Sequence, residues 1–227
     1  MARRPKPSNL RRGSASKPAN GQNKGTNKLR IIGGRWRGRK LEFADLPGLR
    51  PTTDRVRETL FNWLQTQIPG ARCLDLFAGS GALGLEALSR GAEQVTLIDS
   101  ADVVVQQLRQ NLALLNNDQT VNNEQPDETE PQASVIHSQA IAWLQKTTTD
   151  STFDLIFLDP PFGKTMLQQC CELIDQQALL NSNGWIYIEA ESTLQPLPVP
   201  AHWQLHRSLK AGQASCYLYQ HRPLENT

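Results

Sequence analysis

Two short stretches of the sequence hold residues whose types and spacing can do chemistry. The first, LDLFAGSGALGL at residues 74–85, is an apolar run that changes into a glycine-rich turn. Glycines let backbone N–H groups approach a ligand closely. The spacing Gly79-x-Gly81-x-x-Gly84, with Asp99 twenty positions after the first glycine, satisfies the dinucleotide fingerprint. Taken alone, this stretch leaves an NAD-dependent enzyme open.

A carboxylate just ahead of the glycines favours a different cofactor. Asp75 lies four residues before Gly79, beside the place where a dinucleotide would hold its pyrophosphate, and the like charges would repel each other. S-adenosylmethionine has no phosphate, and its methionine part carries an ammonium and a sulfonium. The pattern Asp75-x-Phe77-x-Gly79-x-Gly81 resembles the first motif of the Rossmann-like methyltransferases, which implies that these four residues bind S-adenosylmethionine. A tight strand-to-helix turn without a ligand is the alternative.

The second stretch is DPPF at residues 159–162, directly after the buried run FDLIFL. Because proline cannot continue a central strand, the chain must leave the sheet at its carboxyl edge, where ligands of parallel sheets bind. The Asp159 carboxylate and the Pro160 carbonyl can accept the two N–H groups of an aryl amine and hold its nitrogen toward a methyl donor. Pro161 helps to fix these acceptors, and Phe162 can stack on a flipped base.

This tetrapeptide resembles the Asp/Asn-Pro-Pro-aromatic motif of methyltransferases that act on exocyclic amino groups. An ordinary Asp-Pro-Pro turn is the alternative. Its position after the fourth predicted strand of the sheet whose first strand carries the glycine loop argues against coincidence. The two stretches together favour a methyltransferase over a dehydrogenase.

Alternating strands and helices position both stretches, as is typical of an α/β fold with a doubly wound parallel sheet. We predict a Rossmann-like class I methyltransferase fold, with a mostly parallel seven-stranded sheet and an antiparallel closing strand, preceded by a small N-terminal β-hairpin and helix extension. The expected strands span residues 73–77, 94–98, 134–137, 153–158 and 185–189, with a closing pair at 203–209 and 215–220, and the expected helices span residues 55–66, 82–90, 102–115 and 166–176.

Polar residues at the carboxyl ends of two further strands complete the expected cofactor site. Asp99 can accept hydrogen bonds from ribose hydroxyls, with capping of the next helix as the alternative. Gln139 and Ala140 follow the third strand, where Rossmann-like methyltransferases bring a polar side chain or a backbone N–H near the adenine.

The small net charge of +2 hides a strong asymmetry along the chain. Residues 1–40 hold 13 of the 24 Lys and Arg residues and no Asp or Glu. This separation predicts a basic arm for a polyanion, although a solvated tail is the alternative. We expect a disordered tail at residues 1–28, a hairpin and helix at 29–70 that border an RNA and cofactor cleft, and a catalytic domain at 71–222 with a flexible acidic insertion at 116–132.

Basic residues interleaved with an aromatic side chain form the expected RNA surface. In the predicted hairpin, such residues suit contact with RNA phosphates and an unstacked base; a tryptophan packed on the domain with solvated arginines is the alternative. Further basic residues flank the predicted cleft, where surface ion pairs or solvent contact are the alternative. The candidates are Arg35, Trp36, Arg37, Arg39, Lys40, Arg50, Arg55 and Lys164.

Cysteine usage and hydropathy exclude several other classes of protein. The four cysteines have no C-x-x-C spacing, so we expect no zinc or other metal site. No apolar run is long enough for a membrane span or a signal peptide, which predicts a cytoplasmic protein with reduced thiols. No coiled-coil pattern requires an oligomer, so we expect a monomer.

Longer runs resemble one family closely. IIGGRWRGRKLEF, GLRPTTDRVRETLFNWL, CLDLFAGSGALGLEALSRGA, LIFLDPPF and AGQASCYLYQ, within residues 29–221, are similar to the bacterial 16S rRNA guanine-N2 methyltransferases that modify guanine 966. The resemblance implies methyl transfer from S-adenosylmethionine to the exocyclic N2 of that guanine, in the assembling small ribosomal subunit. It assigns Asp99 to the ribose and residues 159–162 to the guanine.

Two departures and two rival functions accompany this resemblance. Gln139 stands where the family would have Asn or Asp near the adenine, and the basic tail and the acidic insertion are longer than the family needs. One rival is methylation of another planar amine, such as adenine N6 in DNA or a protein glutamine. The other is an rRNA-binding assembly factor without catalysis, which the intact loop and DPPF motif argue against.

Overall fold

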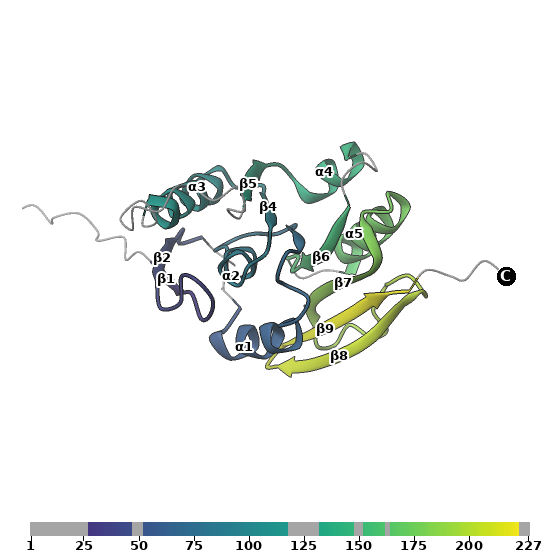
Figure 1. Ribbon diagram of the computed structural model, residues 1–227. Helices are drawn as coiled ribbons and strands as arrows, with labels where there is room; N and C mark the ends of the chain where they lie inside the picture. The colour runs from purple at the N-terminus through teal and green to yellow at the C-terminus, as the bar shows by residue number, and fades with distance from the viewer. Residues whose placement is uncertain (1–26, 47–51, 118–131, 148–151, 162–163, 223–227) are drawn as a thin grey trace, which may run out of the picture.

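The computed structural model describes residues 27–46, 52–117, 132–147, 152–161 and 164–222. Its main sheet has seven strands in the order β5-β4-β3-β6-β7-β9-β8 (Figure 1). The strands are β3 (Arg72–Asp75), β4 (Gln94–Asp99), β5 (Gln132–His137), β6 (Phe153–Leu158), β7 (Leu180–Glu191), β8 (Trp203–Ala211) and β9 (Ala214–His221).

Five of these strands run parallel, and β9 is antiparallel to both of its neighbours, β7 and β8. The predicted mostly parallel sheet with an antiparallel closing strand is therefore confirmed. Because β3, β4, β6 and β7 point the same way, the residues at their carboxyl ends meet at one edge of the sheet. We call this edge, formed by the ends of β3, β4, β6 and β7, the carboxyl edge.

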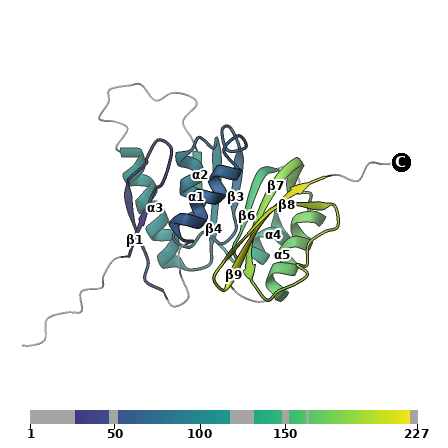
Figure 2. The same cartoon turned by 90° about the horizontal axis from the view of Figure 1, so that it is seen from below.

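Helices cover both faces of the sheet, and Figure 2 shows α1, α2 and α3 on one side and α4 and α5 on the other. The two faces bury separate apolar clusters, in which alternate residues of each strand point to opposite sides. Helix α4 was not among the expected elements, and β7 begins five residues before the predicted strand. The helices are α1 (Asp54–Trp63), α2 (Gly84–Ser89), α3 (Asp102–Asn117), α4 (Ala140–Lys146) and α5 (Lys164–Gln176).

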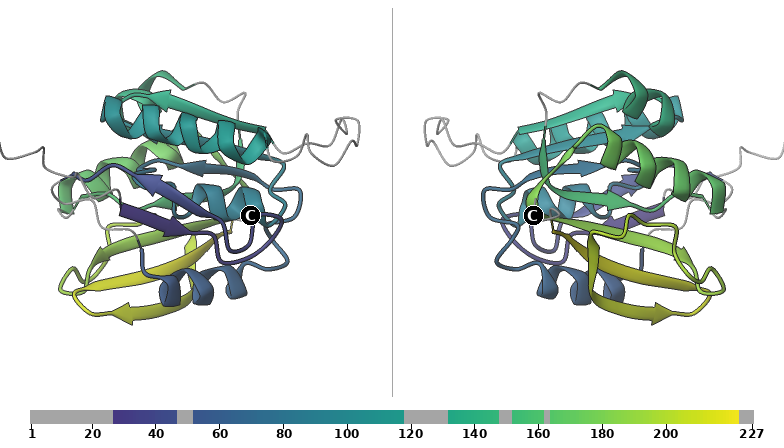
Figure 3. Two further views of the ribbon diagram at one scale, coloured as in Figure 1. Left: turned by 90° about the vertical axis from the view of Figure 1, so that its left-hand side faces the viewer. Right: turned by 90° about the vertical axis from the view of Figure 1, so that its right-hand side faces the viewer.

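The expected N-terminal hairpin is present as β1 (Asn27–Arg30) and β2 (Lys40–Phe43), which pair antiparallel. The hairpin lies against the helical layer, where the side chain of Asn111 in α3 donates to the Glu42 carbonyl at 2.8 Å. Figure 3 shows α1 beside the closing strands β8 and β9. The extension therefore packs directly on the sheet domain.

The hairpin loop makes a close approach to α2 that only glycine permits. Gly34 has φ +74°, and a Cβ there would lie 1.8 Å from the Ser89 carbonyl oxygen. Beside it, the backbone N–H of Trp36 donates to Ser89 Oγ at 3.0 Å, and the Trp36 side chain is 4% exposed. The prediction that Trp36 stacks on an unpaired base is therefore wrong, because the ring is part of the protein core.

The four cysteines are free and buried. Within the described ranges, no helix has the length and apolar character needed to cross a bilayer. The predicted tail at residues 1–28 and insertion at 116–132 lie almost wholly outside the described residues, as do Arg50 and Phe162.

Candidate active site

The glycine loop after β3 is folded around the buried carboxylate of Asp75. This side chain is 2% exposed, and the backbone N–H of Gly84 donates to its Oδ2 at 3.1 Å. A Cβ on Gly84 would lie 2.4 Å from Leu97 in β4, so the third glycine is needed for α2 to pack on the sheet. Gly79 and Gly81 have φ of +49° and +79°, the left-handed conformation that turns strand into helix.

Asp99 at the end of β4 orients the same loop from the other side. Its Oδ2 accepts a hydrogen bond from the Gly79 N–H at 2.9 Å, and its Oδ1 accepts one from the Ala101 N–H at 2.8 Å. The second bond fixes the turn that precedes α3. Because each carboxylate oxygen can accept two hydrogen bonds, this geometry leaves acceptor capacity for ribose hydroxyls.

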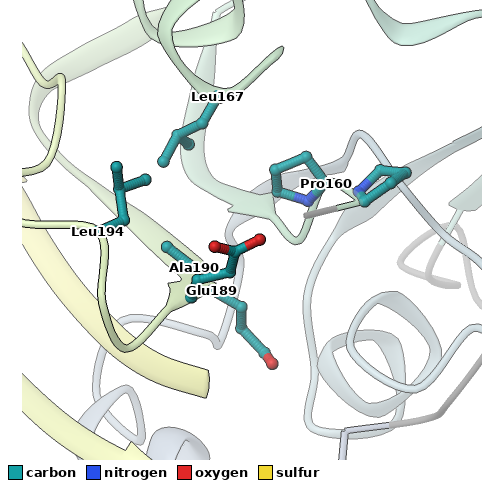
Figure 4. Close-up of a pocket in the computed structure, with 7 residues that line it drawn as sticks. Pro160, Leu167, Glu189, Ala190 and Leu194 are labelled. Atoms are coloured by element: carbon teal, nitrogen blue, oxygen red, sulfur yellow. The ribbon is translucent and has the colours of Figure 1, made fainter. Parts of the chain in front are cut away.

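The Asp-Pro-Pro turn follows β6 at the same edge. Residues 159–161 are described, and Pro160 and Pro161 line a small hollow with Glu189 of β7, shown in Figure 4. Burial, reinforced by the negative charges of Glu189 and Asp75, raises the pKa of Asp159 well above its usual range. The structure thus brings the glycine loop and the Asp-Pro-Pro turn together on one edge.

Glu189 belongs to this site and was missed in the sequence. It is 9% exposed, and the hydroxyls of Tyr187 and Thr52 both donate to its Oε1 at 2.8 Å. Burial raises the pKa of Glu189, while the two hydroxyl hydrogen bonds act in the opposite direction. The available signal was an acidic residue inside the apolar run WIYIEAE of a central strand.

A buried ionic network ties the N-terminal extension to this edge. Arg57 of α1 is fully buried and donates to Asp54 at 2.6 Å, to the Arg30 carbonyl at 3.0 Å and to the Thr52 carbonyl at 3.2 Å. It also lies 3.5 Å from Glu86 of α2. Arg57 therefore holds the segment that carries Thr52.

Glu86 is the acidic centre of that network. Its side chain is fully buried and accepts the backbone N–H groups of Ile32 and Gly33, both at 2.8 Å, and the Arg90 Nε at 2.7 Å. One carboxylate thus joins the hairpin loop, α1 and α2. Such a buried, fully paired carboxylate has a structural role here.

The expected RNA residues are only partly brought to the carboxyl edge. Arg55 is exposed in the first turn of α1, next to the segment that holds Glu189. The hairpin residues Arg35, Arg37, Arg39 and Lys40 are exposed, but the loop contacts Ser89 at the far end of α2. A basic surface one short helix away from the carboxyl edge suits a substrate much larger than a single nucleotide.

Gln139, Ala140 and Lys164 stand at the starts of helices. Gln139 is exposed and has extended backbone geometry at the N-cap of α4, and Ala140 is buried in the first position of that helix. Lys164 is the first residue of α5. The side chain of Gln139 caps no backbone group of α4, which leaves its amide at the start of the helix that follows β5.

S-adenosylmethionine fits the chemistry of these residues. Asp75 beside the glycine loop and Asp99 at the end of β4 offer acceptors, and the edge holds two further carboxyl groups, those of Asp159 and Glu189. Such an edge attracts a sulfonium and an ammonium and repels a pyrophosphate, which disfavours a dinucleotide. Asp75, Gly79 and Gly81 would hold the cofactor's methionine part and Asp99 its ribose.

Comparisons with known proteins point to one family. The family model described as Conserved hypothetical protein 95 matches residues 29–220. The chain is 47% identical over 196 residues to Ribosomal RNA small subunit methyltransferase D of Escherichia coli strain K12, which covers 86% of this chain and 91% of that protein. It also resembles the structure of the putative methyltransferase yhhF from Escherichia coli, with 45% identity and a TM-score of 0.73, over 87% of this chain and 100% of that one.

A more distant structure shares the fold. The Thermus thermophilus 16S rRNA N2 G1207 methyltransferase matches with a TM-score of 0.59 at 23% identity, over 87% of this chain and 50% of that one. The long matches at high identity agree with the glycine loop, the Asp-Pro-Pro turn and the seven-stranded sheet. The chain therefore belongs to the ribosomal RNA small subunit methyltransferase D family and is an S-adenosylmethionine-dependent methyltransferase.

Proposed function

We propose that the enzyme methylates the exocyclic N2 of guanine 966 in 16S rRNA, within the assembling small ribosomal subunit in the cytoplasm. The observation that carries this proposal is the Asp-Pro-Pro turn at the end of β6, on the same edge as the glycine loop of β3. The names of the relatives, which specify small-subunit rRNA, support the same substrate. The exocyclic amine of a guanine has two N–H groups, which match the two adjacent acceptors, the Asp159 carboxylate and the Pro160 carbonyl.

The residues at the turn position the amine. Bound S-adenosylmethionine supplies an electrophilic methyl group. The Asp159 carboxylate and the Pro160 carbonyl accept the two N–H groups of guanine N2 and point its lone pair toward the cofactor loop. The raised pKa of Asp159 suits this carboxylate to receive the proton that the nitrogen loses on methylation. Phe162 follows the turn in sequence, and we propose that it stacks on the flipped base.

Ionisation of Asp75 gives the binding of cofactor a testable pH dependence. Burial raises the pKa of Asp75 to about 7, against hydrogen bonds from the Gly84 and Phe77 N–H groups. A cationic ligand favours the ionised carboxylate, so binding releases a proton below that pKa. We expect S-adenosylmethionine affinity to rise about tenfold per pH unit at most up to pH 7 and then level off. Calorimetry in two buffers of different ionisation enthalpy measures the proton release, and Asp75→Asn should abolish it.

Arg55 is the candidate phosphate contact nearest the base-holding edge. Replacing it with alanine should weaken rRNA binding and lower the slope of log affinity against log salt by about 0.7–0.9, the value for one lost phosphate contact. Binding titrations at several salt concentrations measure this slope. Lys146→Ala, which removes an exposed charge from α4 on the other face, is the matched control. Equal slopes for Arg55→Ala and wild type would remove Arg55 from the RNA surface.

The proposed reaction is tested by labelled methyl transfer from S-adenosylmethionine to small subunits from a strain that lacks the modification. We expect N2-methylguanosine as the labelled nucleoside. Methyl transfer to adenine N6 of duplex DNA, or to a protein glutamine, would show that the acceptor is another amine and not an rRNA guanine. If the protein binds S-adenosylmethionine but transfers no methyl group to any of these acceptors, the result would favour an rRNA-binding assembly factor without catalysis.

A further inference from the structure

The hollow beside the Asp-Pro-Pro turn has a carboxylate in its wall that the proposed mechanism does not use. Glu189 lines it together with Pro160, Pro161, Ala190 and a second glutamate, Glu191, and Leu167 and Leu194 close its apolar side (Figure 4). Phe157 of β6 pairs with Tyr187 of β7. Asp159 and Glu189 each follow two residues later in the chain, so their side chains point to the same face of the sheet. A base held by Asp159 therefore lies next to Glu189.

The orientation of the Glu189 carboxylate is fixed from one side. The hydroxyls of Tyr187 and Thr52 both donate to Oε1 at 2.8 Å, and no other hydrogen bond to this carboxylate is found among the described residues. No lysine or arginine of the described ranges forms an ion pair with it. Burying a carboxylate without a cation is costly, so a purely structural role would be served better by an apolar or amide side chain.

The chemistry of the proposed substrate supplies a partner for that carboxylate. Guanine carries N1–H directly beside its N2 amino group, so the edge that presents the reacting amine also presents one more donor. 2-Aminopurine carries the same amino group, but its N1 is unprotonated and accepts hydrogen bonds. A carboxylate placed beside N1 attracts guanine and repels 2-aminopurine.

We propose that Glu189 accepts the N1–H of the target guanine and is a specificity-determining residue of the base pocket. This inference rests on the proposed guanine N2 reaction. In this proposal the hydroxyls of Thr52, just before α1, and Tyr187 hold Oε1 of Glu189, so that Oε2 accepts the hydrogen bond from the base. The extension at residues 29–70 thereby contributes to base selection.

The test compares two acceptors in otherwise identical substrates. 16S rRNA is ligated from two pieces so that position 966 holds guanine or 2-aminopurine, and each rRNA is reconstituted into small subunits. For the wild-type enzyme we expect kcat/KM to favour guanine by about 10- to 100-fold, the range for one hydrogen bond to a charged group. No methylation of the guanine substrate by the wild type would overturn the proposed function itself.

Two variants then decide the role of Glu189. In Glu189→Gln the two hydroxyls retain the amide oxygen and the NH₂ group faces the base, so the preference for guanine should fall to about threefold or less, chiefly through loss of the guanine rate. An equal loss for both acceptors, with the preference intact, would overturn the proposal. If Glu189→Gln fails to fold, Thr52→Val decides: it keeps the carboxylate but frees it to turn, and an unchanged preference would contradict the assignment.

Discussion

Replacing Asp159 with alanine is expected to lower the rate of methyl transfer to small subunits by about 10²–10³-fold, while S-adenosylmethionine binding stays within about twofold of wild type. The reason is that, in the proposed function, this carboxylate meets the acceptor amine, whereas the cofactor is held by the glycine loop, which Asp75 of β3 and Asp99 of β4 orient. Single-turnover methyl transfer and equilibrium cofactor binding measure the two effects separately.

Asp159→Asn is the matched control for this result. The amide keeps an oxygen that accepts one N–H of the amine, but it cannot take the released proton. We expect a rate about tenfold above that of Asp159→Ala. If alanine at this position transfers methyl groups as fast as wild type, the assignment of the Asp-Pro-Pro turn to the amine is wrong.

Replacing Glu86 with alanine is expected to lower the free energy of unfolding by about 3–5 kcal/mol. The substitution leaves the N–H groups of Ile32 and Gly33 unpaired and removes a carboxylate from beside Arg57, whose charge is fully buried. For a chain of this length, such a loss lowers the melting temperature by roughly 6–20 °C. Denaturant and thermal unfolding followed by circular dichroism measure it.

An exposed glutamate on the neighbouring helix provides the comparison. Glu58 lies on the solvent side of α1, so Glu58→Ala should change the free energy of unfolding by no more than about 0.5 kcal/mol. A similarly small change for Glu86→Ala would mean that the hairpin and α1 are held by their apolar contacts alone.

Much of the fold is readable from the sequence because the central strands β3, β4 and β6 are apolar runs bounded by turn signals. The runs around Cys73, Val95 and Leu155 form neighbouring parallel strands, and Gly91, at φ +95°, follows the end of α2. Helix α4 is not predicted from the sequence because its seven residues are too few to show a helical hydrophobic period that would distinguish it from a loop.

The parts of the site that local patterns missed depend on contacts between distant segments. Trp36 has basic neighbours on both sides, which suggested an exposed ring, yet a loop pressed against Ser89 buries it. Arg57 lies in the predicted helix at residues 55–66, but its burial depends on Glu86, a buried partner 29 residues away. Glu189 meets Thr52 across 137 residues of chain. No window of the sequence contains both members of such pairs.

The most direct test of guanine N2 as the acceptor is to map the methyl group on 16S rRNA itself. Unmodified small subunits are incubated with enzyme and S-adenosylmethionine, the rRNA is cut with a nuclease, and the fragments are sequenced by mass spectrometry. We predict a single methyl group per rRNA, on N2 of guanine 966, and none with Asp159→Ala. A methyl group on adenine, or methyl groups spread over many guanines, would contradict the proposed function.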